Sequence, residues 1–210
     1  MIAPNTPGTW YVCFSFSKGS VSVLFVPAGG AITLPAQLLV VARNHLGLPA
    51  PQIQLSPATN LWQYVQMPTW AWVLESAWTP LTSSANAGPV TVTVIATPIR
   101  LVFSYQTKGD GSASTVTCTG PGTPYNDQLA ESENPDRPVL AASPDCGWTW
   151  HQSSADTPDQ RYAVSAHTVY HVLWTIRGAP GGGDLGELSG LKTDLRVTVG
   201  EIQALNTAPR

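Results

Sequence analysis

Residues 90–118, VTVTVIATPIRLVFSYQTKGDGSASTVTC, decide the fold of this chain. Apolar and polar residues alternate from Val90 to Thr97, a pattern typical of a β-strand with one buried face. Proline cannot donate a hydrogen bond to a sheet, so Pro98 predicts a bend or bulge, after which a second strand starts at Ile99. A short strand ending at Cys118 follows. The stretch therefore predicts the centre of an antiparallel β-sandwich.

The tripeptide Gly109-Asp110-Gly111 lies between the second and third of these strands. Aspartate binds calcium well, but no run of alternating acidic residues follows, as a calcium-binding loop would need. Two glycines allow a positive φ, and an aspartate side chain can accept hydrogen bonds from turn amides. We therefore interpret Gly109, Asp110 and Gly111 as turn-forming residues and not as a metal site.

The composition of the 210 residues excludes several classes of protein. Only 11% of the residues are charged and the net charge is −3, which argues against a surface that binds nucleic-acid phosphates. No stretch reaches the roughly 18 consecutive apolar residues that a membrane-spanning helix needs, so no direct membrane insertion is expected. The first thirty residues lack the basic start and apolar run of a signal peptide, so we expect any export signal to be absent from this sequence.

The N-terminal region predicts a hairpin and one helix. Residues 10–16 alternate and residues 21–26 are largely apolar, which predicts a β-hairpin. Residues 34–46 predict a helix, with Thr33 as its N-cap and Gly47 at its C-terminal stop. The apolar stripe expected along this helix consists of Leu38, Val41, Ala42 and His45.

Polar runs rich in glycine and proline separate the other predicted strands. Residues 82–89 (TSSANAGP) are interpreted as a linker or a sandwich loop. Residues 119–144 are interpreted as a long loop that is mobile in its middle, and residues 180–190 as a flexible hairpin connection. The longest predicted strand is 161–177, with residues 191–199 returning antiparallel to it.

These elements predict a mainly β chain: an antiparallel β-sandwich with a small N-terminal hairpin-plus-helix region. The expected organisation has two parts. Residues 1–82 hold the hairpin, the helix and tryptophan-rich strands that dock on the sandwich, and residues 83–210 form the sandwich itself.

A strand that leads to Gly109-Asp110-Gly111, followed by YAVSAHTVYHVLWTI at residues 162–176, resembles polycystic-kidney-disease (PKD)-type domains. Those are immunoglobulin-like modules of cell-surface and secreted proteins. The chain is also similar to a family of uncharacterised exported actinobacterial proteins, from about Leu48 to Asn206. The segments that carry this resemblance are LPAPQIQLSP, VQMPTWAWV, GPVTVTVIATP, CTGPGTPY, SPDCGWTW and EIQALN. The resemblance implies an immunoglobulin-like fold and export, not an activity.

Two of the three cysteines flank the polar run 119–144. Cys118 and Cys146 would close a loop of about 27 residues, and a disulfide there would stabilise the fold by roughly 3–4 kcal/mol in the chain-entropy view. An exported setting favours this bridge over two unrelated buried thiols. Cys13 lies in an apolar strand, which favours an inert buried thiol over a nucleophile.

Eight tryptophans are more than one sandwich core needs. Trp70 and Trp72 are two residues apart, as are Trp148 and Trp150, so on a strand each pair shares one face. Exposed, these pairs would form a flat binding surface for a glycan or a protein. Buried, they would pack the helix or the hairpin onto the sandwich. The sequence leaves both interpretations open.

No pattern for catalysis or cofactor binding stands out. His167 and His171 would lie roughly 13 Å apart along a strand, too far to share one zinc ion. The sequence has no Gly-x-Ser-x-Gly nucleophile turn and no phosphate-binding loop. We therefore expect no catalytic residues, no metal and no cofactor.

Together these features favour a non-enzymatic module, extracellular or at the cell surface, that serves adhesion or assembly. Its expected partner is another protein or a cell-wall glycan, and a homo-oligomer is a further candidate; nucleic acid is not expected. Two alternatives stay open. One is a carbohydrate-binding module that uses the paired tryptophans, and the other is a hydrolase whose residues converge only in three dimensions.

Overall fold

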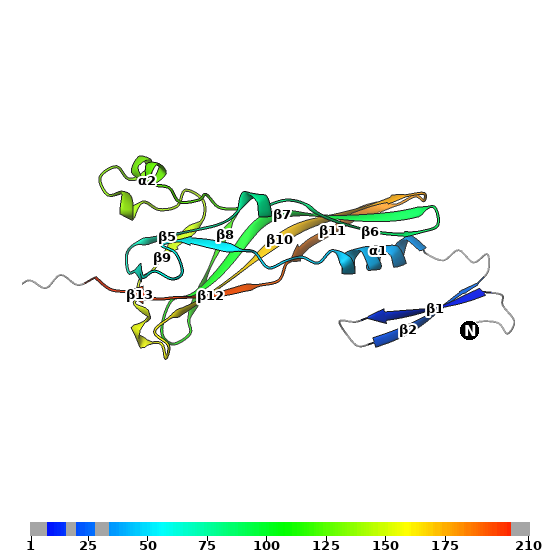
Figure 1. The fold of residues 1–210 in the computed structure, drawn as a ribbon, viewed down its shortest axis with the longest axis horizontal. Coiled ribbons are helices and arrows are strands. Elements are labelled where there is room, and N and C mark those ends of the chain that lie inside the picture. Colours follow the sequence, from blue (N-terminus) through cyan, green and yellow to red (C-terminus); the bar gives the residue numbers. More distant parts are fainter. Residues whose placement is uncertain (1–7, 16–19, 28–33, 203–210) are drawn as a thin grey trace, which may run out of the picture.

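The computed structural model describes residues 8–15, 20–27 and 34–202 (Figure 1). The described chain is mainly β, and its larger sheets are antiparallel, as the sequence predicts. The predicted N-terminal hairpin is present as β1 (Gly8–Ser15) paired with β2 (Ser20–Pro27). Among the described residues, no helix is both long enough and apolar enough to cross a membrane.

Two long strands, β7 (Val90–Gln106) and β10 (Tyr162–Arg177), form the axis of the fold. They pair antiparallel from Tyr105 opposite Val164 to Thr91 opposite Arg177. In Figure 1 they run together along most of the length of the molecule. Every other strand of the central sheet pairs with one of these two.

A β-bulge interrupts this pairing at the predicted position. Tyr170 lies opposite Pro98 and Val169 lies opposite Arg100, so Ile99 has no partner in β10. One extra residue moves the side chains that follow it to the other face of a strand. The buried positions of β7 accordingly change from even to odd numbers. Val92, Val94 and Ala96 are buried before the bulge, and Leu101 and Phe103 after it. The predicted second strand is thus the continuation of the first.

The two halves of the β7–β10 pair have different flanking strands. In the half that contains Val90–Ala96, β6 (Leu81–Ala87) pairs with β7 and β11 (Gly182–Ser189) pairs with β10. In the half that contains Leu101–Gln106, β8 (Ala113–Cys118) pairs with β7 and β12 (Thr193–Val197) pairs with β10. The sheet order is therefore β11-β10-β7-β6 in one half and β12-β10-β7-β8 in the other.

Two of the predicted loops are strands. Residues 82–89, interpreted as a linker or loop, lie mostly in β6, and residues 180–190, interpreted as a flexible connection, contain β11. Both strands consist largely of small or polar residues, so the strand state comes from pairing with β7 and β10 rather than from an apolar pattern. The expected boundary between residues 82 and 83 falls inside β6. Whether the chain divides into two parts stays a prediction.

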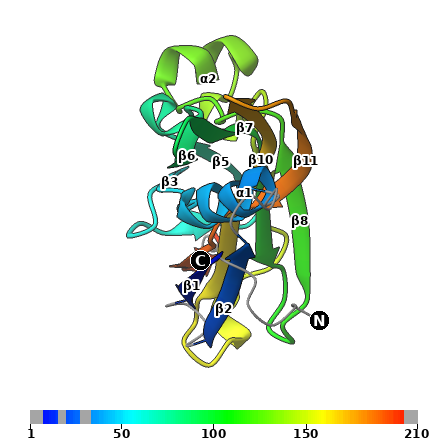
Figure 2. The same ribbon diagram turned by 90° about the vertical axis from the view of Figure 1, so that its right-hand side faces the viewer.

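Helix α1 (Leu34–His45) covers the half of the sheet that contains β6 and β11 (Figure 2). Leu38, Ala42 and Leu46 are buried, and Ala42 and Leu46 pack against Val94, Ala96, Tyr170 and Val172. The predicted helix and its stop are confirmed, since Gly47 has φ +53°. Its buried stripe is rotated from the predicted one, because Val41 is 42% exposed and His45 is exposed. Thr33, the predicted N-cap, lies outside the described residues.

A three-stranded antiparallel sheet covers the other half. It consists of β3 (Ile53–Ser56), β5 (Pro68–Val73) and β9 (Gly147–Thr149) in the order β3-β5-β9. Its inner residues share one core with β7, β8 and β10. The core includes Leu55, Ala71, Val73, Leu101, Phe103, Val164 and Ala166. Two sheets thus pack face to face in this half, as in a β-sandwich.

Smaller elements complete the fold. A parallel pair, β4 (Gln63–Tyr64) and β13 (Val199–Gly200), lies at the end of the sandwich half. Helix α2 (Asp127–Glu133) stands beside the three-stranded sheet (Figure 1). Short 3-10 turns lie at Glu75–Ala77, Pro138–Leu140 and Ser154–Asp156.

The pairing of β9 with β5 predicts a glycine requirement at Gly147. A Cβ at Gly147 would lie 2.3 Å from the carbonyl oxygen of Thr69, a backbone atom that cannot move without disturbing β5. We expect Gly147→Ala to lower the free energy of unfolding by about 1–3 kcal/mol, the usual cost of overpacking. Urea unfolding followed by circular dichroism measures it. Gly120→Ala is the matched control, because a Cβ at Gly120 meets nothing within 4 Å. Equal stability of the two variants would contradict this account.

Candidate functional site

The four tryptophans of the expected binding surface are mostly inside the protein. Trp70, Trp148 and Trp150 are only 1%, 6% and 1% exposed, and Trp72 is half-buried. The interpretation as an exposed platform is therefore wrong for three of them. The alternative that the sequence left open, burial, holds instead.

Trp148 and Trp150 lie in a cluster of aromatic rings between the two sheets. Trp148 stacks on Tyr105 with ring centres 4.9 Å apart, and Trp150 stacks on Tyr162 at 5.5 Å. The two indoles meet edge to face at 5.8 Å. Because β9 pairs with β5, its i, i+2 face is turned towards β7 and β10, which supply the two tyrosines. The pair therefore fills the core and offers no face to a ligand.

Trp70 points to the opposite side of the three-stranded sheet, where residues 119–144 cover it. Its Nε1 donates to the carbonyl oxygen of Ala141 at 2.8 Å, and its ring meets Tyr125 edge to face. Ala130 of α2 is fully buried in the same cluster. The prediction of a long loop over residues 119–144 is thus partly wrong, because the segment contains α2 and packs as a lid over Trp70.

The lid is held at its ends and at its helix. Cys118 and Cys146 form the predicted disulfide, with Cα atoms 5.3 Å apart. The side chain of Asn126 caps α2 by accepting a hydrogen bond of 2.7 Å from the Leu129 amide. The disulfide also ties β8 of the central sheet to the start of β9, and so links the two layers. The side chain of Cys13 lies outside the described residues, so its predicted burial stays a prediction.

A buried chain of polar groups, which sequence reasoning missed, lies beneath Trp150. The indole Nε1 of Trp150 donates to Thr69 Oγ1 at 3.0 Å, and Thr69 Oγ1 donates to Gln63 Oε1 at 2.8 Å. Gln63 Nε2 in turn donates to the carbonyl oxygen of Pro57. Gln63 and Thr69 are almost fully buried. Because every donor in this chain has a partner, the polar residues stabilise the core and are not free to bind a ligand.

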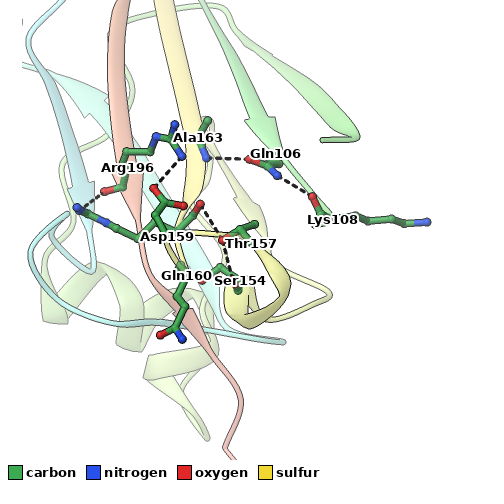
Figure 3. A network of polar contacts seen from close by, with 9 residues as sticks. Gln106, Lys108, Ser154, Thr157, Asp159, Gln160, Ala163 and Arg196 are labelled. Carbon is green, nitrogen blue, oxygen red and sulfur yellow. Dashed lines mark hydrogen bonds and ion pairs between the residues drawn. The ribbon is translucent and has the colours of Figure 1, made fainter. Parts of the chain in front are cut away.

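The end of the sandwich half carries a network of polar contacts around residues 153–162 (Figure 3). The hydroxyl of Ser154 accepts from the Val199 amide at 2.9 Å and donates to the carbonyl oxygen of Gln160 at 2.6 Å. Thr157 Oγ1 donates to the Ser154 carbonyl at 2.8 Å, and Arg196 pairs with Asp159 at 3.0 Å. Most of these partners are backbone groups. The network therefore holds the loop onto the ends of β10, β12 and β13.

A polar hollow of about 290 Å³ opens beside this network. Its lining includes residue types found in hydrolases, namely His151, Ser153, Asp156 and Glu201. Within residues 34–202, however, no hydrogen bond joins His151 to Ser153 or to either carboxylate, as a nucleophile and its base would require. The Ser153 carbonyl instead accepts from the Tyr162 hydroxyl at 2.7 Å. Within residues 34–202 these four side chains form no hydrogen-bonded nucleophile–base pair, and the hydrolase alternative stays a hypothesis.

The Gly109-Asp110-Gly111 tripeptide is a turn, in agreement with its interpretation. Gly111 has φ +88°, and Asp110 Oδ1 accepts from the Ser112 amide at 2.8 Å. Hydrogen bonding to Ser112 lowers the pKa of Asp110. Across the described ranges, no three His, Cys, Asp or Glu side chains come together to hold a metal ion.

Charged groups on the uncovered face of the sheet pair with one another near the bulge. Arg100 and Glu187 form a bidentate ion pair, and His171 Nε2 lies 2.9 Å from Asp184 Oδ2. Burial, and then the charges of Lys192 and Arg100, lower the pKa of His167. These pairs connect β7 and β10 to β11, so they link neighbouring strands of the sheet.

A second hollow, of about 260 Å³, lies where α1 ends and the three-stranded sheet begins. It is mainly apolar, with Pro49, Pro51, Leu74 and Tyr170 in its wall. No charged side chain lines it, but Gln52, Ser76 and Thr168 do, so it can offer a ligand apolar contact and a few hydrogen bonds.

Comparison with protein-family models, with curated proteins and with solved structures finds no match to this chain.

The Gln63–Thr69–Trp150 chain predicts that the Thr69 hydroxyl matters more than its methyl group. Thr69→Val leaves the Trp150 Nε1 donor and the Gln63 oxygen buried without partners, at about 1–3 kcal/mol each. We expect a loss of about 2–4 kcal/mol in the free energy of unfolding, measured in urea. Thr69→Ser keeps the hydroxyl and should cost about 1 kcal/mol. A Thr69→Val protein as stable as Thr69→Ser would contradict the role of this chain.

Proposed function

We propose that this protein is a non-enzymatic module outside the cell that binds another protein through its N-terminal hairpin. The observation that carries the proposal is the register of β1 and β2. Trp10 lies opposite Phe25, Val12 opposite Val23 and Phe14 opposite Val21. Directly opposed residues share a face of an antiparallel ribbon, so these six apolar residues lie on one face.

The other face of the ribbon is mixed. Tyr11 lies opposite Leu24, but Cys13 lies opposite Ser22 and Ser15 opposite Ser20. Within the described residues, β1 and β2 pair only with each other. A two-stranded ribbon is marginally stable alone, and a wholly apolar face on it favours a partner that covers it. We assign a protein partner to this face because no charged or amide residue occupies these six positions, so an aromatic platform here would lack the polar contacts that orient a sugar.

Two further features support a place outside the cell and an immunoglobulin-like, PKD-like character. The disulfide Cys118–Cys146 is of a kind that persists in oxidising compartments. It links two facing sheets next to buried tryptophans, an arrangement that immunoglobulin-like sandwiches share. The same bridge suits an adhesion or assembly module that has to survive without chaperones.

Site-specific photo-crosslinking in the producing cell tests the hairpin face. A benzoylphenylalanine at Val23, on the apolar face, should form a discrete adduct with another protein, resolved by gel shift and mass spectrometry. The same group at Ser22, on the mixed face, is the matched control and should form far less. If position 23 crosslinks only within its own chain, the hairpin face is covered internally and the proposal fails.

Carbohydrate binding is the second candidate, and one observation favours it. Trp62 is 58% exposed, and its ring lies against the backbone of Gly200 at the end of the sandwich half. A single exposed indole is a smaller platform than the four tryptophans that the sequence suggested. The polar hollow does not extend it, because alternation along β4 places Trp62 and Val65 on opposite sides of that strand.

Fluorescence titration with cell-wall glycans separates the two candidates. We expect no saturable change in tryptophan emission, since three of the four indoles of the predicted platform are buried. The Trp62→Phe variant identifies the source of any change that does occur. A saturable response that this substitution abolishes would establish a carbohydrate site at Trp62 and favour the second candidate.

A further inference from the structure

The two edges of the central sheet are built differently. One edge consists of β11 and then β12, both paired with β10, and the other consists of β6 and then β8, both paired with β7. A free edge strand exposes a row of unpaired amides and carbonyls, which can pair with a strand of another chain. Natural proteins therefore protect free edges with charges, prolines, bulges, or a helix or loop that covers the edge.

The β11–β12 edge carries several of these protective features. The β10–β11 register shifts between Val172 and Leu173, which marks a bulge, and Gly186 beside it has φ +73°. Asp184 and Glu187 are exposed on β11, and Asp194 and Arg196 are exposed on β12. Charge and irregular backbone thus oppose the addition of another strand at this edge.

The β6–β8 edge carries no charge, proline or bulge. β6 reads LTSSANA and β8 reads ASTVTC, so neither contains a charge, a glycine or a proline. Both pair with β7 without a shift of register. Within the part of the chain that the structure describes, no other strand pairs with β6 or β8 on the outer side. Their outer amides and carbonyls are free to pair with an added strand.

Helix α1 adds a second observation at β6. The helix packs on β6 and β7, so it lies on the face of the sheet beside this edge. Its outer surface exposes two neighbouring valines, Val40 at 58% and Val41 at 42%. In strand addition, backbone pairing supplies the affinity and neighbouring side chains the specificity, so exposed apolar residues near β6 favour this edge. No such apolar residues accompany β8, whose exposed positions are Ala, Ser and Thr.

We propose that β6 pairs antiparallel with β6 of a second copy of this chain, about a two-fold axis at Ser84. In this register Ser84 lies opposite its own copy, Thr82 opposite Asn86 and Leu81 opposite Ala87. No like charges meet, because the strand has none. The polar residues Thr82, Ser84 and Asn86 stay on the open face in both copies, and Leu81, Ser83, Ala85 and Ala87 stay on the helix side. A strand of this composition is therefore complementary to itself.

The two-fold axis of such an edge pair is perpendicular to the sheet. Both copies of α1 therefore lie on the same face of the continuous sheet, one on each side of the axis. The surface is separate from the hairpin face that binds the proposed partner protein. Either one can fail in experiment while the other stands.

Sedimentation equilibrium of the full chain tests the pairing. The unaltered protein is expected to reach twice the 22.3 kDa of one chain with increasing concentration. Ser84→Lys brings two ammonium groups together at the axis and should raise the dissociation constant at least tenfold. Ser84→Glu should do the same, and mixing the two variants should restore a dimer. Ser84 is exposed, and thermal unfolding of each variant checks that the fold is intact.

Thr117→Lys is the matched control, since Thr117 is an exposed residue on β8, the other unprotected edge strand. This substitution should leave the dimer unchanged. A monomer at every accessible concentration, or a dimer that tolerates Ser84→Lys, overturns the inference. A dimer lost in Thr117→Lys places the contact on β8 and also overturns it. A dimer lost only in Val23→Lys assigns self-association to the hairpin, which rejects β6 and leaves the hairpin proposal standing.

Discussion

Pairing between β7 and β10 is the interaction on which the rest of the structure depends. The two strands are long enough to support two different covers, α1 over one half and a three-stranded sheet over the other. An uninterrupted β7 would turn the apolar residues of one half away from their cover, since its apolar positions are even before Pro98 and odd after Ile99. The bulge at Ile99 corrects this mismatch by one residue. The bulge allows both halves to share a single pair of strands, so a substitution that disturbs this pair disturbs both cores.

The features that could be predicted from the sequence are those with a local signal. Alternation along residues 90–97 and 161–177 gives strands, a glycine at position 47 stops a helix, and Pro98 gives a bulge. β6 and β11 had no such signal. Ser83, Ala85 and Ala87 are too small to mark a buried face, and β11 contains three glycines. Their strand state depends on free backbone groups of β7 and β10 nearby, a condition that only the folded chain supplies.

The tryptophans show the same limit at the level of the site. The two-residue spacing correctly predicts that Trp148 and Trp150 share one face of a strand, but it does not predict which residues pack against that face. Tyr105 and Tyr162 come from strands more than ten residues away in sequence, and they convert a potential platform into a core. Trp70 is covered because a polar segment forms α2, whose only fully buried residue is Ala130. A seven-residue helix with one buried alanine has almost no apolar period to detect.

The charges of the sheet have a consequence for its two edges. Hydrogen bonds from the Gly186 amide and then from His171 lower the pKa of Asp184, and Arg100 lowers the pKa of Glu187. A carboxyl group with a depressed pKa in the folded state stabilises the fold above its unfolded pKa, and this contribution is lost as the pH falls through the folded value. Acid therefore loosens the links that hold β11, although exposed pairs of this kind contribute little. β6 contains no titratable side chain, so acid does not act on that strand directly. Leu81 and Ala85 of β6 and Leu185 and Leu188 of β11 pack against the same core, so burial and backbone pairing hold both edges. Only the β11 edge adds a small contribution from ionised side chains, and only that contribution changes with pH.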